Sequence, residues 1–196
     1  MSVALEWARW WNHAWREADR DWYPPMLRLL TERQIDALAR GHHAALARSF
    51  GMTPCTAPKP TPSVQSLCCG TPRTLSLACQ LVANTCSPST TTGTLSAQDR
   101  AWCERTAKAL RPGHWLELDQ DPLVLLRAWL DVRTWERARL AFPRSRIDAI
   151  ESLPAPQPPA AKLNMLWQSA SWKAEQSLAA PAPTRMEMHD VRSAFA

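Results

Sequence analysis

Glycine is scarce in this chain, which has five glycines in 196 residues. A sheet protein of this size needs many tight turns, and glycine is the residue that most readily supplies them. The shortage of glycine, together with frequent Ala, Leu and Arg, therefore favours helices. Eleven Trp stand against one Tyr and three Phe, so indole rings should fill much of the core. We expect an all-α fold, a small single-domain bundle of short, Trp-rich helices.

Long apolar runs are missing as well. No stretch approaches the ~18 apolar residues that a membrane span requires. The N-terminal residues carry charges every few positions, which is not the pattern of an export signal. We therefore expect a cytoplasmic protein whose six cysteines are free thiols that pack as small apolar residues.

Motifs of catalysis and ligand binding are also missing. The chain has no glycine-rich phosphate loop, no G-x-S-x-G, no HExxH and no paired C-x2-C. Cys103 and His114 could form a nucleophile and base, but a lone Cys on a helix packs far more often than it reacts. His42 and His43 would point about 100° apart on a helix and cannot bind one ion together. We expect no enzyme, no cofactor and no metal site.

Residues 1–52 predict two helices. In the first, apolar residues recur at steps of four and three, so that one stripe holds Ala4, Ala8, Trp11, Trp15, Ala18 and Trp22. The Tyr-Pro-Pro stretch at 23–25 should end this helix, because proline cannot continue the hydrogen-bond ladder. Thr31 and Gln34 have the spacing of a capping box, so the second helix should begin there and end at Gly51.

Residues 53–98 differ sharply in composition from the rest. Lys59 and Arg73 are their only charged residues, they have no aromatic residue, and their apolar residues follow no helical period. Ser, Thr, Pro and Cys dominate, which is typical of a disordered insert that cannot bury enough surface to offset chain entropy. A stretch of the gene read out of frame would give a similar change, and the protein sequence does not distinguish the two.

The C-terminal part again predicts charged, Trp-bearing helices. One should run from about Ser96 to Leu110. The next should begin with Asp121 as its N-cap and Pro122 as its first helical residue.

The rest of this part predicts a connector, a long helix and a tail. The proline-rich stretch 153–162 should form a stiff connector. The last helix should bury one face, which holds Leu163, Leu166, Trp167, Ala170, Ala174 and Leu178. We expect residues 99–180 to pack with residues 1–52, and residues 181–196 to form a flexible tail.

The stretch "TWERARLAFPRSRID", residues 134–148, is a candidate for a binding surface. Trp135 and Phe142 fall on one face of a predicted short helix, which we expect to be buried, and Pro143 should end that helix. The arginines then face solvent or a partner, and Arg is enriched at interface anchors. A solvated helix surface without a partner is the alternative. The candidate partner contacts are Arg133, Arg137, Arg144 and Arg146.

Met165 and Trp172 lie opposite the apolar stripe of the last helix. Their neighbours Ser169 and Gln176 are small or neutral, where a surface helix normally has Lys or Glu. Either the helix is central and packs on both sides, or these residues belong to an exposed apolar patch that a partner covers. Met165 and Trp172 are therefore candidate partner contacts too.

Two stretches are similar to a known family. The first is "LDVRTWERARLAFPR" at 130–144, and the second is the Leu-x-x-Leu-Trp-Gln helix at 163–168. With their surroundings, residues 99–178, they resemble the SctK family, the cytoplasmic adaptors of bacterial type III secretion systems, and most closely the Hrp-type branch of plant pathogens. The N-terminal Trp-rich helix resembles the family more loosely, and residues 53–98 depart from its pattern.

The resemblance implies a non-enzymatic, all-helical scaffold at the cytoplasmic face of the inner membrane. It would link the ring protein SctD to the sorting-platform pods of SctQ, which carry SctL and the ATPase SctN. The net charge of +5 leaves a second hypothesis open, a small basic helical protein that binds nucleic acid or acts as a regulator. Because Glu136 interrupts the basic side and the aromatic residues fall on the buried face, we favour a protein partner over nucleic acid.

Overall fold

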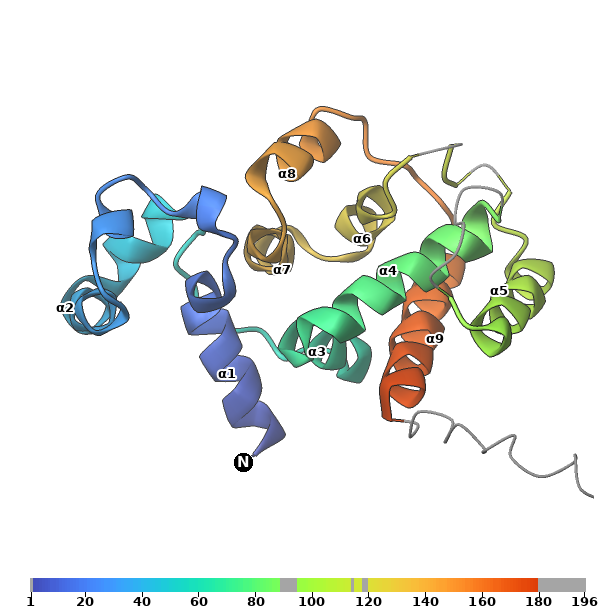
Figure 1. The fold of residues 1–196 in the computed structure, drawn as a ribbon, viewed down its shortest axis with the longest axis horizontal. Helices are drawn as coiled ribbons and strands as arrows, with labels where there is room; N and C mark the ends of the chain where they lie inside the picture. Colours follow the sequence, from blue (N-terminus) through green and yellow to red (C-terminus); the bar gives the residue numbers. More distant parts are fainter. Residues whose placement is uncertain (1, 89–94, 114, 118–119, 180–196) are drawn as a thin grey trace, which may run out of the picture.

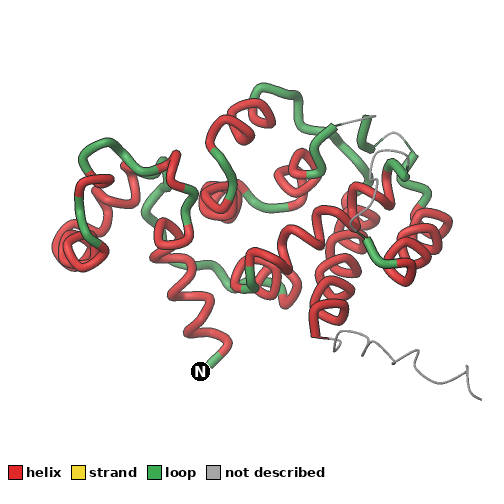
Figure 2. Tube along the Cα trace, in the orientation of Figure 1, coloured by secondary structure: helices red, strands yellow, loops and turns green. Residues whose placement is uncertain are grey.

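The computed structural model describes residues 2–88, 95–113, 115–117 and 120–179. All regular structure in these ranges is helical, which confirms the all-α prediction (Figures 1 and 2). The α-helices of these ranges are α1 (Val3–His13), α2 (Glu32–Ser49), α3 (Pro62–Cys69), α4 (Pro72–Cys86), α5 (Ala97–Leu110), α6 (Leu123–Trp129), α7 (Val132–Ala138), α8 (Arg144–Glu151) and α9 (Ala160–Ala179). Short 3-10 turns are η1 (Ala14–Glu17), η2 (Arg20–Trp22), η3 (Leu27–Leu29) and η4 (Arg139–Ala141).

The core forms where α4 lies against α9. This pair has the most extensive contact of the described helices, and α3, α5 and α6 also pack on α9 (Figure 1). Ala78 on α4 and Ala170 and Ala174 on α9 are completely buried, and such small side chains let two helices approach closely. Larger side chains with no exposed surface fill the space beside them: Leu81, Val82, Leu166 and Trp167.

The prediction of a disordered insert at 53–98 is wrong for the described part of that segment. It forms α3 and α4, and α4 belongs to the centre of the core. Each helix begins at a Thr-Pro pair, in which the Thr61 or Thr71 hydroxyl accepts the backbone N–H of Val64 or Thr74. The proline that follows each threonine is the first helical residue, where its missing N–H costs nothing.

Burial over much of its circumference explains why α4 has almost no charge. Its buried residues are Thr74, Ala78, Cys79, Leu81, Val82, Asn84 and Thr85. A helix packed against several other helices has little solvated surface for Lys or Glu, and after the first residue of α4 only Arg73 and Ser76 are exposed on it. Residues 89–94 of the same segment, and the tail predicted at 181–196, lie outside the described residues.

The N-terminal tryptophans are buried, but the prediction of one continuous helix through them is wrong. The buried indoles of this part are Trp7, Trp11, Trp15 and Trp22. α1 ends at His13, and the chain continues through η1 and η2. Contacts distant in sequence fix this path, because the Asp19 N–H donates to the Leu140 carbonyl at 2.6 Å and the Trp22 Nε1–H donates to the Phe142 carbonyl at 2.8 Å. Tertiary hydrogen bonds therefore override the helical period here.

α2 begins and ends where the sequence predicts. The Thr31 N–H donates to Gln34 Oε1 at 2.8 Å, and the Gln34 N–H donates to the Thr31 hydroxyl at 3.4 Å, so the capping box is present. Gly51 follows the C-cap residue Phe50 with a φ of +70°, the left-handed conformation that favours glycine at a helix end.

The starts of α5 and α6 are close to their predicted positions. Ser96 caps α5, which ends at Leu110. α6 begins at Leu123, one residue later than predicted, with Pro122 in the N-cap position. The Asp121 carboxylate still accepts the Leu123 N–H at 2.9 Å, so its capping role is as expected.

Candidate protein-interaction surfaces

The arginine-rich stretch folds as two short helices rather than one. The Asp131 carboxylate starts α7 by accepting the N–H groups of Arg133 and Thr134 at 3.0 and 3.1 Å. α7 ends at Ala138, η4 follows, and Pro143 stands immediately before α8. Because the chain turns between α7 and α8, the arginines of the stretch point into different surroundings.

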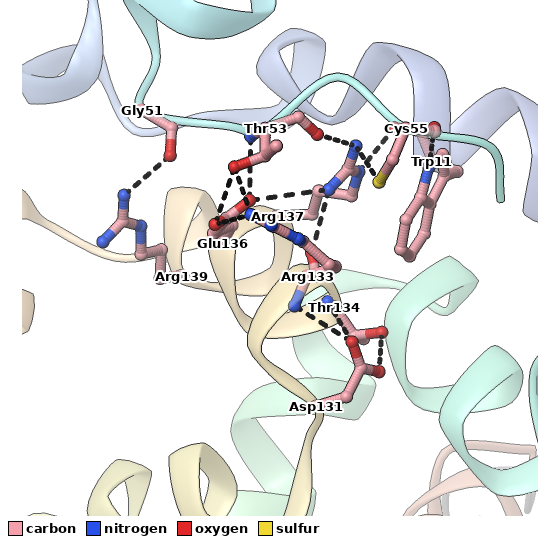
Figure 3. Close-up of polar contacts among 10 residues, drawn as sticks. All are labelled: Trp11, Gly51, Thr53, Cys55, Asp131, Arg133, Thr134, Glu136, Arg137 and Arg139. Atoms are coloured by element: carbon pink, nitrogen blue, oxygen red, sulfur yellow. Dashed lines mark hydrogen bonds and ion pairs between the residues drawn. The ribbon is translucent and has the colours of Figure 1, made fainter. Parts of the chain in front are cut away.

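Arg137 is buried, so the prediction that it contacts a partner is wrong. Its residue surface is 4% exposed, and its guanidinium lies 3.8 Å from the centre of the Trp11 ring (Figure 3). It donates to the carbonyl oxygens of Trp11, Thr53 and Arg133 at 2.9, 3.1 and 2.9 Å. Burial lowers the pKa of Arg137 from its ordinary value. Arg137 thus joins α7 to α1 and to the loop after α2.

Arg133 is exposed but already has partners. Its guanidinium donates to Glu136 Oε1 at 2.8 Å and to the Thr53 hydroxyl, while its side chain stays 47% exposed. Glu136 Oε2 also accepts the Thr53 N–H at 2.8 Å (Figure 3). Glu136, which the sequence presents as an interruption of a basic face, therefore holds the loop after α2 onto α7.

Arg144 and Arg146 lie on the surface of α8, as predicted. Arg146 forms a two-bond ion pair with Asp121, with Nε–Oδ2 at 2.5 Å and Nη2–Oδ1 at 3.0 Å. The hydrogen bond to Asp121 raises the pKa of Arg146 above its ordinary value although burial opposes this. The guanidinium of Arg144 lies 5.4 Å from the centre of the Trp22 ring and forms no ion pair with a described residue. Of the four candidate arginines, Arg144 is the most available to a partner.

Arg139 is a structural residue that the sequence does not reveal. Its guanidinium pairs with both oxygens of Glu151 at 2.9 and 3.1 Å and donates to the Gly51 carbonyl at 3.1 Å. The Trp135 Nε1–H donates to the same carboxylate at 2.8 Å. Although partial burial opposes ionisation, the hydrogen bonds from Trp135 and Arg139 hold the pKa of Glu151 below its ordinary value.

Met165 and Trp172 are both 56% exposed on the outward face of α9. Burial of Leu163, Leu166 and Trp167 confirms the predicted inner stripe. The hypothesis that α9 packs on both sides does not hold for these two residues, because more than half of each residue's surface is exposed. Leu178 was expected in the inner stripe but is 45% exposed.

Near the end of α9, the inward-facing Lys173 forms a buried ion pair. Lys173 Nζ lies 2.9 Å from Asp99 Oδ1 of α5, and both side chains are only 8% exposed. The hydroxyls of Ser96 and Ser177 donate to the same carboxylate at 2.6 and 2.7 Å. Although burial opposes ionisation, the bonds from Ser96, Lys173 and Ser177 hold the pKa of Asp99 below its ordinary value. The sequence offers one signal for this pair, because Lys173 falls on the same face of the helix as the buried Ala170. Helical periodicity alone gives no reason for a charge at that position.

The candidate nucleophile Cys103 is a packing residue. It is 1% exposed, its Sγ lies 3.5 Å from the Leu81 carbonyl, and burial raises its pKa. Its proposed partner His114 lies outside the described residues. The described residues contain no group of three or more His, Cys, Asp or Glu side chains that could hold a metal ion.

A small apolar cavity lies beside the arginine network. Its volume is about 70 Å³, and its wall includes Trp10, Leu67, Leu126 and Ala138. Sites for small molecules typically have volumes of about 300–1,000 Å³, so this cavity is smaller than such a site.

Among the described helices, none is both long and apolar enough to cross a membrane. No protein-family model, curated protein or solved structure matches the chain.

Proposed function

We propose that this chain is a non-enzymatic adaptor of a bacterial type III secretion system. In this role it binds at the cytoplasmic face of the inner membrane and links an SctD-like ring protein to SctQ-like pods, which carry the SctL-like stator and the ATPase. The proposal is supported by the resemblance of residues 130–144 and 163–168 to the SctK family.

The exposure of large apolar side chains at two separate places is the observation on which the proposal depends most. On the N-terminal side, Met26 and Leu29 are 80% and 86% exposed next to α2. On the other side, Met165 and Trp172 are exposed on α9. α2 and α9 lie on opposite sides of α1 and α3 in the helical body (Figure 1). Exposed apolar residues mark interaction sites when they gather, and an adaptor needs two such sites that can be occupied together.

The alternative is a small basic protein that binds nucleic acid. It is favoured by Arg33, Arg40 and Arg48, which are exposed along α2. It is disfavoured at α7, because Arg137 is buried and Arg133 is already paired with Glu136. A protein that neutralises phosphates should lose about one log unit of affinity per log unit of salt for each contact.

Capture experiments test the adaptor proposal. The immobilised full chain is exposed to lysate from bacteria that express a complete type III secretion system, and bound proteins are identified by mass spectrometry. We expect the ring and pod proteins to be retained, and the double variant Met26→Ala/Leu29→Ala to lose at least one of them at an unchanged melting temperature. Val132→Ala, which truncates a side chain that is 70% exposed elsewhere, is the matched control. Retention of neither protein, or tight salt-sensitive binding to random duplex DNA at physiological salt, would contradict the proposal.

A further inference from the structure

The side of α2 that faces solvent differs from an ordinary solvated helix surface. α2 lies at one end of the molecule, away from α4 and α9 (Figure 1). A solvated helix side normally has long polar side chains, as α5 does at Gln98, Glu104 and Lys108. A Cβ atom added at Gly41 would meet no other part of the fold within 4 Å, so this side is open. The exposed residues in the middle of α2 are small or apolar, and they form its outer face: Ala37, Leu38, Gly41, Ala44 and Ala45.

Three arginines accompany this outer face, and none of their guanidinium groups has a partner. Arg33, Arg40 and Arg48 are exposed. None of them forms a side-chain hydrogen bond, an ion pair or a ring contact with a described residue. Arg33 and Arg40 are seven residues apart, about two helical turns, so they lie on the same side of α2 before its kink at His42.

The fold itself leaves these charges uncompensated. Asp36 is three residues after Arg33 and four before Arg40, which is the spacing at which side chains of one helix pair. Its carboxylate instead accepts a hydrogen bond from Arg16 of η1 at 2.6 Å. The other acidic residue of α2, Glu32, stands alone in the first turn. The outer face is therefore edged by positive charge that no described residue neutralises.

We propose that the outer face of α2 binds a helix of a partner protein that carries acidic residues beside an apolar stripe. Small residues let a second helix approach closely, so large apolar side chains of the partner fit over Ala37, Gly41 and Ala44. Carboxylates seven residues apart on the partner match the spacing of Arg33 and Arg40, so each guanidinium meets one carboxylate. The inference rests on the proposed function in that it names the chemistry of the partner at the N-terminal adaptor surface.

Two other anionic partners fit the outer face less well. Nucleic acid would meet the arginines through its phosphates, but a helix that reads base edges presents polar side chains where α2 presents alanines and a glycine. A lipid surface is bound through large apolar side chains that insert into it, and alanines supply little apolar area. The small apolar residues beside the arginines therefore favour a protein helix.

Binding of a synthetic peptide to the purified full chain tests the charge. The probe is a helical peptide of about 21 residues, three heptads, in which leucine and glutamate each recur every seven positions. Fluorescence anisotropy of the labelled peptide gives the dissociation constant. We expect the triple variant Arg33→Glu/Arg40→Glu/Arg48→Glu to raise this constant at least about tenfold, because each reversal replaces an attraction with a repulsion. The same peptide with lysine in place of glutamate should not bind.

A matched triple variant separates the outer face from the net charge of the chain. Arg73→Glu/Arg105→Glu/Lys108→Glu makes the same change in net charge at three exposed residues of α4 and α5. It should leave the dissociation constant within about twofold of the wild type, since screening weakens charges that do not touch the peptide. Circular dichroism and the melting temperature check that both triple variants fold.

A longer side chain on the outer face tests the close approach of the partner helix. Ala44→Gln keeps the charge and the helix propensity but places a longer side chain where the partner should pack. We expect the dissociation constant to rise by about fivefold or more. Ala109→Gln, at an exposed position of α5, is the control and should change nothing.

Three results overturn the proposal. The first is an acidic peptide that does not bind at concentrations up to about 1 mM. The second is binding that the α2 triple variant does not weaken, or that the matched triple variant weakens equally. The third is random duplex DNA or phosphatidylglycerol vesicles that bind more tightly than the peptide and are released by the α2 triple variant, which makes that ligand the occupant. Failure of the capture from lysate bears on the secretion role alone, since the peptide experiment contains no secretion protein besides this chain.

Discussion

The charge-poor middle of the chain and the arginine-rich stretch after it contrast in composition. The first is predicted to be disordered but is helical and buried, and the second is predicted to face solvent but is partly buried. Residues 61–86 contain one charged residue, Arg73, and form α3 and α4, of which α4 belongs to the centre of the core. Residues 131–151 are rich in charge, yet their Arg137 is among the most buried polar residues described. Charge content thus reports how many faces of an element are solvated, and not whether the element is ordered. An arginine can be interior where carbonyl oxygens and an indole ring satisfy its guanidinium.

The largest effect should come from placing a charge in the middle of the chain. Leu81 has no exposed surface, so Leu81→Asp would bury a carboxylate without a partner at a cost of several kcal/mol, comparable with the whole stability of a domain. We expect the variant to lose its cooperative thermal transition in circular dichroism. Ser76→Asp, on an exposed position of the same helix, should melt like the wild type. Equal melting of both variants would mean that α4 is not part of the core.

The next largest effect should come from removing a charge from the arginine-rich stretch. Arg137→Ala leaves three carbonyl oxygens and the Trp11 ring without their partner and should cost about 3–5 kcal/mol in urea unfolding. Arg144→Ala should change stability by less than about 0.5 kcal/mol, since this side chain makes no ion pair with a described residue. Similar costs for the two would show that Arg137 is as solvated as the sequence suggests.

These two regions also show how far the sequence predicts the structure. Local signals located several helix starts well, as at the capping box of Thr31 and the Ser96 cap, because those hydrogen bonds join neighbours in sequence. The inner stripe of α9 followed from its period for the same reason. The sequence also placed Met165 opposite that stripe, but only the structure shows that no described helix covers it.

Prediction failed where a residue's environment comes from distant parts of the chain. A helical wheel cannot show that the loop containing Thr53 passes over Arg137, or that Lys173 meets Asp99 across two helices. Nor can it distinguish a helix without charge because it is buried on several sides from a segment without charge because it is disordered.

A smaller effect should distinguish the buried pair on α9 from ordinary serine contacts. Ser177→Ala removes a 2.7 Å hydrogen bond to the ionised Asp99 and should cost about 1–2 kcal/mol at neutral pH. Because the folded-state pKa of Asp99 lies below its ordinary value, its contribution is present above about pH 4 and is lost as the pH falls through the folded value. The cost of Ser177→Ala should therefore shrink in acid.

The control for this pH dependence lies on the same helix. Ser169 donates to the carbonyl oxygens of Met165 and Leu166, which do not titrate, so the effect of Ser169→Ala should stay constant with pH. The measurement is urea unfolding of each variant and the wild type across the acid range. A cost of Ser177→Ala that also stays constant would show that Asp99 keeps its ordinary pKa.

The smallest effect concerns the residue that starts α4. Thr71 is exposed, and its hydroxyl accepts the Thr74 N–H at 3.2 Å, so Thr71→Ala should cost about 1 kcal/mol in urea unfolding. Thr56→Ala, at an exposed position of the loop before α3, should cost nothing measurable. Thr71→Asp should be at least as stable as the wild type, because a carboxylate also caps the helix and interacts favourably with its dipole. Thr71→Asp would then be tolerated at the solvated start of the helix, whereas Leu81→Asp, ten residues later, would be strongly destabilising. Equal effects at both positions would contradict the conclusion that burial, and not disorder, keeps charge out of this segment.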